Sequence, residues 1–585
     1  MFGEVNPRQH TPVAPVPRPA GIVCCLLALL PLMPAASRAA VPRAPAGFGL
    51  GVVYHVPADP EQIVADLDAM KAAGIDGVLI GINPFHEPDW SDCHFAIEQA
   101  DDRTMKVVIL TPTDWFGRPS YDGMSAQMVD AQGESHLGFS YSCRPAMEAI
   151  AASHARLVKE FARHRNIVYE ILVNEVWAWE DCSTWAQADF REYLRNLLPD
   201  VGYWNERWGT SFANFDTIDL CAAYREEAAD RLRADAIIHR SKAYAAFFQR
   251  LYQAAREAGA PWPISGMKLY TNYYSNHHLE SARCALDMHM LFREHDCNDV
   301  IAVHDYDWGS TAARQSKLRT LWLCYDAPPV VTEAWKVAVD DKAEAVKHFD
   351  ESIAHMKRAK VLYNPSWIFF YQWEWVRGAP DVLRRLRTEV APLCRRDLGT
   401  PVADDVGILD GRAAHYLYDV RTERAYFRLN DFLADQGLMP TQVYMDESQQ
   451  FSLGRAAFDS LPRLLLVPFD RGLYADTLRK YPGKVWMQTD PADVLDGVAL
   501  RRLLAQAGVE PIIREARRPP GVREQVYLRD GRPILGIANT TDRPARVSYR
   551  VHLDGKDWTV RATVPPQRVA VVEMEASRQG YRHHV

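Results

Sequence analysis

The chain has 585 residues, of which 48% are hydrophobic and 24% are charged, a composition typical of a folded globular protein and not of a disordered one. Its formal net charge is -8 and its lysines and arginines are interspersed among acids, so it has no basic stripe for a phosphate backbone, and nucleic acid is not an expected partner. A chain of this length accommodates one large domain and one or two smaller ones.

Residues 1–40 have the features of a cleaved signal peptide. Arg8 and Arg18 precede the apolar run "IVCCLLALLPLM" at 22–33, and Ser37 and Ala39 supply small residues at the two positions that a signal peptidase reads. The run is too short for a transmembrane helix, which needs ~20 residues. We therefore expect a periplasmic or secreted protein that is not stably inserted in a membrane. An uncleaved anchor or a misassigned start codon is the alternative.

Beyond the leader, short Val/Ile/Leu runs alternate with stretches of helical periodicity. The runs lie at 50–54, 77–82, 106–110, 167–173, 263–268, 300–304, 329–332 and 367–371. Strands that are apolar throughout are buried on both faces, as the strands of parallel sheets are. Eight such strands, each with a helix available to follow it, predict a (β/α)8 TIM barrel over 41–395, with an active site at the carboxyl ends of its strands.

The first helix of this barrel is well marked. Asp59 is suited to cap it, Pro60 to occupy its first position and Gln62 to complete a capping box, and Gly74 ends it.

Two glutamates follow strands on the expected catalytic edge. The fourth strand is followed by Asn174 and Glu175, and the seventh by Glu333. We expect the two carboxylates to face each other across the barrel mouth, where such a pair suits cleavage of a glycosidic bond. A glutamate in this position is more often a solvated loop residue, and Glu87, Glu180 and Glu374 lie on nearby loops. The pairing on strands four and seven favours the catalytic interpretation.

Aromatic residues also follow the strand ends. Flat rings stack on the apolar faces of sugars, while polar groups bind the hydroxyls. In barrels such residues often only fill the space between helix and strand, but a position just past a strand end is less easily explained by packing. The aromatic residues concerned are Trp177, Tyr306, Trp308, Trp335 and Trp373.

These segments resemble the clan A glycoside hydrolases, and in particular the family forty-two β-galactosidases. The similar segments are, in order, "INPFHEPDWSDCHF", "LTPTDW", "NEVWAWEDCSTWAQADFREYLR", "YWNERWGTSF", "DVIAVHDYD", "VVTEAW" and "FFYQWEW". The resemblance implies that Glu175 is the acid/base and Glu333 the nucleophile. It also implies that Asn174 binds the 2-hydroxyl and that Trp373 lies beneath the terminal sugar.

The chain departs from the family pattern at two places. Members commonly carry an arginine before the cysteine that follows strand three, where this chain has "GFSYSC", and this weakens an assignment to galactose. The cysteine cluster that binds zinc in some relatives is reduced to Cys143 and Cys182. We therefore expect no metal and no cofactor.

Eight cysteines follow the leader and contain no CxxC pair, so a zinc ribbon is not indicated and disulfides become possible in an oxidising compartment. Cys143 and Cys182 follow strands three and four on neighbouring loops of one rim. We expect a disulfide between them, with two independent buried thiols as the alternative.

Two smaller domains follow the barrel. Short strands and helices over 402–515 predict an α/β (flavodoxin-like) domain with a parallel sheet; its strands include "AAHYLYD", "TQVYM", "PRLLLVPF" and "GKVWMQ". It has no GxGxxG turn for a dinucleotide. The resemblance implies trimerisation, which light scattering would test. Alternating strands over 520–585 predict a C-terminal antiparallel β domain that packs against the rest, and no exposed aromatic row marks it as a sugar-binding module.

We therefore expect an exported retaining β-glycosidase, similar to β-galactosidases, that releases terminal β-linked sugars through a covalent glycosyl-enzyme intermediate. Within enzymes, the sugar could instead be mannose, glucose or arabinose, or the cleavage could be internal to a polysaccharide. In a different class, the barrel could bind glycans without cutting them.

Overall fold

The computed structural model describes the chain from residue 47 onward, with gaps. The described residues are 47–84, 90–111, 126–173, 181–225, 228–265, 268–270, 298–306, 310–325, 328–335, 348–411, 420–445, 451–452, 461–469, 478–490, 495–574 and 583–584. The leader, Asn174 and Glu175 lie outside them.

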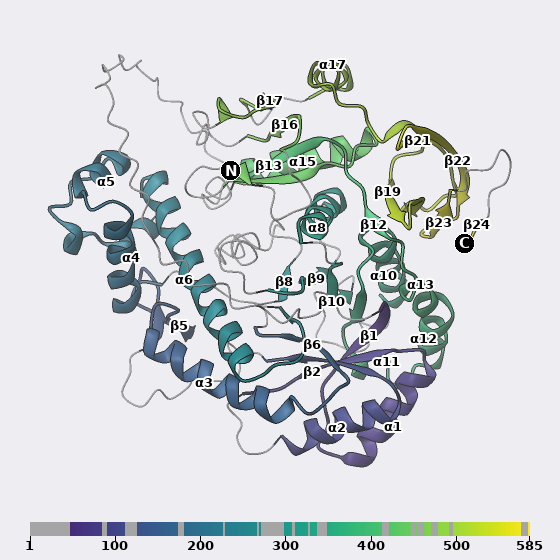
Figure 1. Ribbon diagram of the computed structural model, residues 1–585, viewed down its shortest axis with the longest axis horizontal. Coiled ribbons are helices and arrows are strands. Elements are labelled where there is room, and N and C mark those ends of the chain that lie inside the picture. The colour runs from purple at the N-terminus through teal and green to yellow at the C-terminus, as the bar shows by residue number, and fades with distance from the viewer. Residues whose placement is uncertain are drawn as a thin grey trace, which may run out of the picture. The chain divides into compact units, whose positions relative to one another are not determined.

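The first domain has parallel strands at its centre and helices around them (Figure 1), and its strand order confirms the predicted TIM barrel. Strand order is β7-β6-β3-β2-β1-β11-β10-β9-β8, and β1 pairs with β11. β7 and β8 are two parts of the fifth strand, since β7 pairs with β6 and β8 pairs with β9. The strands are β1 (Gly49–Tyr54), β2 (Gly77–Gly81), β3 (Lys106–Leu110), β6 (Ile167–Ile171), β7 (Ile264–Ser265), β8 (Lys268–Tyr270), β9 (Ala302–Tyr306), β10 (Val330–Trp335) and β11 (Trp367–Phe370).

Side chains alternate between the barrel interior and the layer beneath the helices. An interior cluster includes Tyr169, Ala302, Val330, Trp367 and Phe369, and a separate cluster lies between the strands and the helices. Large and small residues complement each other inside: a Cβ added at Gly51 would lie 2.2 Å from the Phe369 ring. The glycines of β1 therefore make room for the aromatic residues of β11.

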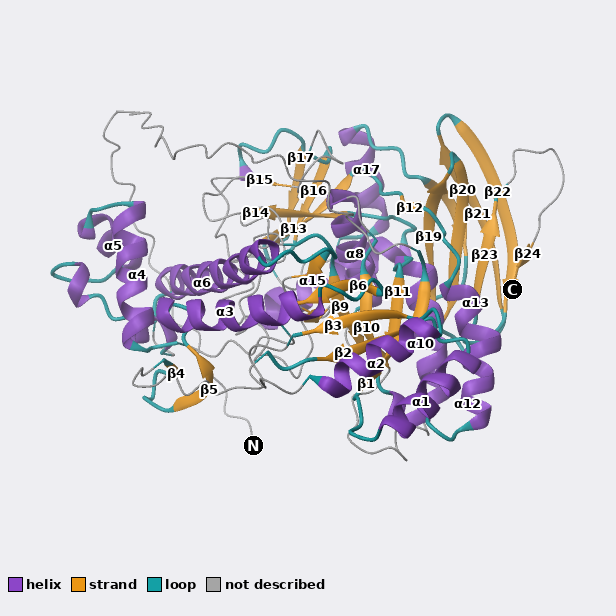
Figure 2. Cartoon of the chain, turned by 60° about the horizontal axis from the view of Figure 1, so that its bottom comes forward, coloured by secondary structure: helices purple, strands orange, loops and turns teal. Residues whose placement is uncertain are grey.

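Helices cover the outer face of the barrel (Figure 2). They are α1 (Pro60–Ala72), α2 (Ser91–Asp102), α3 (Arg144–Phe161), α6 (Asp230–Glu257), α8 (Thr311–Tyr325) and α10 (Phe349–Tyr363). Shorter turns follow the last strand: α11 (Trp373–Val376), α12 (Pro380–Arg385), the π-turn η4 (Leu386–Val390) and α13 (Ala391–Cys394). Within the described residues no helix is long and apolar enough to cross a membrane.

The first helix is capped by Asp59, as expected, but Gln62 does not take part in the cap. The Asp59 side chain accepts a hydrogen bond from the Glu61 amide at 3.0 Å, and Gly74, with φ +78°, follows the helix end. The predicted capping box is wrong. Gln62 Nε2 instead donates to Asp66 Oδ1 at 2.9 Å, one helical turn further on.

Two insertions interrupt this part of the barrel. The hairpin β4 (Gln127–Val129) and β5 (Ser135–Phe139) lies between β3 and α3. The second insertion lies between β6 and α6 and contains α4 (Thr184–Leu197), α5 (Val201–Trp208) and the 3-10 turns η1 (Phe215–Thr217) and η2 (Leu220–Tyr224). α4 and α5 share an apolar cluster with η2 and the start of α6 that contains Phe190, Trp204 and Trp208. Both ribbon views place α4 and α5 at one end of α6.

The second domain is α/β, as predicted. Its sheet has the order β15-β14-β13-β16-β17, parallel except for β15. The strands are β13 (Val406–Gly411), β14 (Thr441–Met445), β15 (Phe451–Ser452), β16 (Leu464–Val467) and β17 (Lys484–Met487), and the helices are α15 (Val420–Asp435) and α17 (Gly497–Ala507). The strand expected at 413–419 lies outside the described residues. β13 itself was not predicted, because its short apolar run ends in Asp-Gly, which is typical of a turn.

The third domain consists of two antiparallel sheets. One has the order β12-β19-β20-β23-β24 and the other β18-β21-β22. The strands are β12 (Thr400–Pro401), β18 (Ile513–Arg517), β19 (Val522–Arg529), β20 (Arg532–Asn539), β21 (Ala545–Leu553), β22 (Lys556–Val564), β23 (Val569–Glu573) and β24 (His583–His584). An apolar cluster containing Val526, Leu535, Tyr549 and Val551 fills the space between the sheets.

Barrel helix α8 contacts both smaller domains. Gln315 Nε2 donates to the Glu524 carbonyl at 2.7 Å, and the Ser316 hydroxyl donates to the Pro440 carbonyl at 3.0 Å. These buried hydrogen bonds join the barrel, the second domain and the third domain.

Candidate active site

Glu333 faces the barrel interior because strand β10 contains a bulge. Val331 pairs with Val303, but Glu333 pairs with His304, so that Thr332 is an extra residue in the ladder. The Thr332 hydroxyl donates to the Val303 carbonyl at 3.0 Å. Side chains alternate along a strand, so a regular strand with Val330 inside would turn Glu333 toward the helices. The extra residue reverses this and places Glu333 on the same side as His304.

The Glu333 carboxylate is nearly buried and lies beside a histidine. Glu333 is 5% exposed, and its Oε2 lies 3.0 Å from Nδ1 of His304, which is fully buried. The two residues lie above the interior cluster, toward the carboxyl ends of the strands. A carboxylate in this position, with little access to water, is suited to attack a bound substrate.

The next residue of β9 anchors that strand to the helices. Asp305 is fully buried and lies 3.2 Å from Arg314 Nη1 on α8 and 3.2 Å from His355 Nε2 on α10. Opposite charges and hydrogen bonds therefore hold the outer side of β9. His304, which points the other way, is placed by the same strand.

Strand four is anchored in a similar way. Glu170 on β6 is fully buried, and its Oε1 lies 2.6 Å from Nε2 of the buried His154 on α3. Trp262 Nε1 donates to the other carboxylate oxygen at 2.8 Å, and the Thr111 hydroxyl donates to Oε1 at 3.4 Å. This network precedes Asn174 and Glu175, which lie outside the described residues.

Three of the predicted aromatic residues lie at the carboxyl ends of barrel strands, and the other two, Trp177 and Trp308, lie outside the described residues. Tyr306 and Trp335 end β9 and β10 and pair with each other across the ladder, but their side chains lie outside the described part of the chain. Trp373 begins α11 and is fully buried, and its indole Nε1 has no hydrogen-bond partner among the described residues. The contacts of these three residues with a sugar stay predictions.

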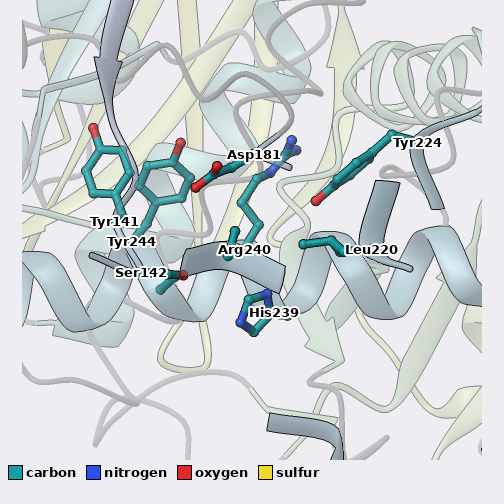
Figure 3. Close-up of a pocket in the computed structure, with 10 residues that line it drawn as sticks. Tyr141, Ser142, Asp181, Leu220, Tyr224, His239, Arg240 and Tyr244 are labelled. Atoms are coloured by element: carbon teal, nitrogen blue, oxygen red, sulfur yellow. The ribbon is translucent and has the colours of Figure 1, made fainter. Parts of the chain in front are cut away.

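A small cavity of about 10 Å³, room for about one water molecule, lies between η2, α6 and the segment before α3 (Figure 3). In Figure 3 the Asp181 carboxylate and the Arg240 side chain lie between the rings of Tyr141 and Tyr244 on one side and Tyr224 on the other. Burial raises the pKa of Asp181. The lining contains none of the site residues predicted from the sequence; it consists of Tyr141, Ser142, Asp181, Ala186, Leu220, Tyr224, His239, Arg240, Ala243 and Tyr244.

Cys143 and Cys182 do not form the expected disulfide. Neither sulfur is in a disulfide bond: Cys143 is fully buried at the N-terminus of α3, and Cys182 precedes α4. Cys182 lies instead within hydrogen-bonding distance of Cys221 on η2, whose sulfur also accepts from Gln187 Nε2 at 3.1 Å. The first turn of α4 packs on η2, and that packing determines which thiols meet. Among the described residues, no group of three His, Cys, Asp or Glu is arranged to hold a metal.

Comparisons with known proteins agree with this architecture. The family model for glycoside hydrolase family 42, described as β-galactosidase, matches residues 55–379, more than half of the chain. No curated protein sequence matches.

Solved structures share the fold at low sequence identity. A β-galactosidase from G. stearothermophilus has a TM-score of 0.65 at 14% identity, covering 90% of this chain and 98% of that chain. One from the haloarchaeon Halorubrum lacusprofundi has a TM-score of 0.64 at 15% identity, covering 90% and 99%. One from the psychrophilic Marinomonas ef1 has a TM-score of 0.61 at 14% identity, covering 89% and 99%. The chain, by the match to the family model, belongs to glycoside hydrolase family 42, the β-galactosidase family.

Proposed function

We propose that this protein is an exported, retaining β-glycosidase, similar to β-galactosidases, that removes terminal β-linked sugars from oligosaccharides. The observation that carries the proposal is the nearly buried Glu333 carboxylate, which faces the barrel interior toward the carboxyl end of strand seven. Barrel enzymes hold their catalytic groups at that edge. The leader supports export, and N-terminal sequencing of the mature chain, expected to begin near Ala40, tests it.

Hydrolysis with retention proceeds in two steps. Glu333 attacks the anomeric carbon while the bond to the leaving oxygen breaks, and Glu175 gives that oxygen its proton. In the second step Glu175 takes a proton from a water molecule, which attacks the same carbon and releases Glu333. We expect the two carboxyl groups to lie ~5–5.5 Å apart, the separation that allows direct attack.

His304 serves as a positioning residue for the nucleophile. Its imidazole lies 3.0 Å from the Glu333 carboxylate and comes from the neighbouring strand, so it limits the directions in which the carboxylate can point. A positioned attacking group needs less rearrangement in the transition state. His304 was not predicted as a site residue, because a histidine in an apolar strand is most often a buried structural residue.

The remaining proposed contacts concern the sugar. We assign Asn174 to the 2-hydroxyl, and Tyr306, Trp335 and Trp373 to the faces of the sugar rings. Family membership supports galactose as the terminal sugar. The departure at "GFSYSC" leaves glucose and mannose as the alternatives to be compared.

A panel of chromogenic β-galactosides, β-glucosides and β-mannosides tests the proposal. The purified mature protein should hydrolyse the β-galactoside with the highest kcat/KM. The Glu333→Gly variant should lose turnover and regain it with added azide, which replaces the missing nucleophile and gives a product of inverted configuration. Unchanged turnover by this variant would reject the assignment of Glu333. Failure of the unmodified protein to cleave any glycoside would favour a barrel that only binds glycans.

A further inference from the structure

The outer face of the three-stranded sheet in the third domain carries three arginines. Arg517 on β18 pairs with Ser548 on β21, which pairs with Arg561 on β22. Residues directly opposite each other in a ladder point to the same side of a sheet. Arg546 lies two residues before Ser548 and therefore points to that side too. We call Arg517, Arg546 and Arg561 the arginine face.

The arginine face looks away from the domain core. All three arginines are exposed, whereas Tyr549 and Val551, which point to the other side of β21, are buried in the apolar cluster between the sheets. The strands of a sheet are ~4.8 Å apart, so Arg517 and Arg561, two strands apart, are separated by ~10 Å. Three long cationic side chains therefore share one small area.

These three arginines have no acidic partner in direct contact among the described residues. Within the described residues, none of the three arginines forms an ion pair. Two acids lie on the same side of the sheet and contact other residues. Glu515 pairs with Arg550, and Asp557 lies 2.7 Å from His552 Nδ1. Like charges side by side on a sheet repel one another, so this arrangement opposes folding. An anionic ligand would relieve the repulsion.

The arginine face also borders a hollow. An open depression is lined by the arginine face together with Val547, Ser548, Ala562 and Thr563. Ser548 and Thr563 lie on the outer side with the arginines and supply hydroxyl donors and acceptors. Guanidinium groups match the planar, two-oxygen geometry of carboxylate and sulfate groups, to which they donate paired hydrogen bonds.

We propose that the arginine face binds an anionic polysaccharide, a glycan that bears sulfate or uronic acid groups. The choice of a glycan among polyanions rests on the proposed function. Single-stranded nucleic acid is disfavoured because binding sites for it use stacked aromatic rings, and Trp558, the aromatic residue of β22, packs toward the domain core. A membrane surface is disfavoured because no large apolar side chain projects from this face for insertion into lipid.

Affinity electrophoresis of the full mature protein in gels containing polysaccharide tests the proposal. The probes are dextran sulfate and polygalacturonate, with neutral dextran as the uncharged reference. The test variant is Arg517→Gln/Arg546→Gln/Arg561→Gln. Each exposed contact between an arginine and an anionic group raises the binding affinity by roughly a factor of three to five. We therefore expect the triple variant to bind the two anionic polysaccharides roughly 30- to 100-fold more weakly.

A matched control removes the same charge elsewhere. The variant Arg501→Gln/Arg502→Gln/Arg532→Gln replaces three exposed arginines outside the arginine face, and it should bind like the unmodified protein. Neither variant should have a lower melting temperature than the unmodified protein, since all six side chains are exposed. Hydrolysis of a small chromogenic β-galactoside should be unchanged too, because such a substrate cannot reach both the active site and the arginine face.

The outcomes separate the proposal from its alternatives. Preferential binding of both anionic polysaccharides over dextran, lost in the test variant alone, supports it. Equal binding by the two variants, or no preference over dextran, overturns it. Equally tight binding of single-stranded DNA or of phosphatidylglycerol vesicles would overturn the assignment to a glycan. Lack of β-galactoside hydrolysis in every variant would refute the proposed function and leave the binding result standing.

Discussion

The buried pair of His154 and Glu170 offers a sharp prediction, because it holds the strand that leads to Glu175. Both side chains are 0% exposed, and the ring nitrogen lies 2.6 Å from the carboxylate oxygen. In the variant His154→Leu the carboxylate loses its shortest contact and retains the Trp262 donor at 2.8 Å and the longer Thr111 contact at 3.4 Å. Removing one partner of a buried pair typically costs ~3–5 kcal/mol, and we expect a loss of that size here.

A second variant tests whether this loss of stability arises from the charge of the Glu170 carboxylate, which His154→Leu leaves without its histidine partner. Glu170→Gln is neutral and still offers an acceptor to Trp262, so we expect it to cost ~1–2 kcal/mol. The double variant His154→Leu/Glu170→Gln contains no buried charge, and its cost should stay near ~1–2 kcal/mol. The two residues should therefore show a coupling free energy of ~3–5 kcal/mol in a double-mutant cycle.

Scanning calorimetry of the barrel transition is the assay. The single variant His154→Leu should lower the melting temperature by roughly 4–7 °C, and the double variant should recover most of that loss. The control His348→Leu changes a histidine that is 33% exposed beside Glu351 and should stay within ~0.5 kcal/mol of the unmodified protein. If the double variant is as unstable as His154→Leu, lost packing and not an unpaired charge explains the effect, and the reasoning fails.

Further predictions concern the nucleophile, a buried lysine and the thiols. His304→Phe should lower kcat roughly 10- to 100-fold with little change in KM, because Glu333 loses its positioning contact; an unchanged kcat would remove His304 from the mechanism. Burial lowers the pKa of Lys360 from 10.5 to about 7, so between these values the unfolded chain binds more protons than the folded chain, and the free energy of unfolding rises with pH. Denaturant unfolding should show a gain of ~2 kcal/mol from pH 7 to pH 9 that Lys360→Met lacks, and an equal gain in that variant would contradict the assignment. After exposure to a disulfide donor, mass spectrometry should find Cys182 and Cys221 joined, and alkylation of both would refute the contact.

The barrel was predictable from the sequence because its strands are apolar on both faces. "KVVIL" and "WIFF" are continuous apolar runs, as expected for parallel strands between a packed interior and a layer of helices. The position of Glu333 at the end of such a run followed from the same pattern. The antiparallel strands of the third domain were predictable from their alternation, since one face of each meets the core and the other meets solvent.

Features that depend on pairing between distant segments were not predictable. The direction of the Glu333 side chain depends on the bulge at Thr332, which exists only in the register with β9. The role of His304 depends on that same register. The contact between Cys182 and Cys221 requires the packing of η2 on the start of α4, and loop positions alone suggested Cys143 as the partner. The arginine face could not be predicted from the sequence either, because its three arginines come from three different strands.

Proton NMR of the first sugar released from a β-galactoside by the unmodified enzyme tests the central claim most directly. If Glu333 attacks the anomeric carbon and water then displaces it, configuration is inverted twice, and the β-anomer should appear first, before mutarotation. An initial α-anomer would show that a water molecule makes the only attack, and it would contradict the assignment of Glu333 as the nucleophile.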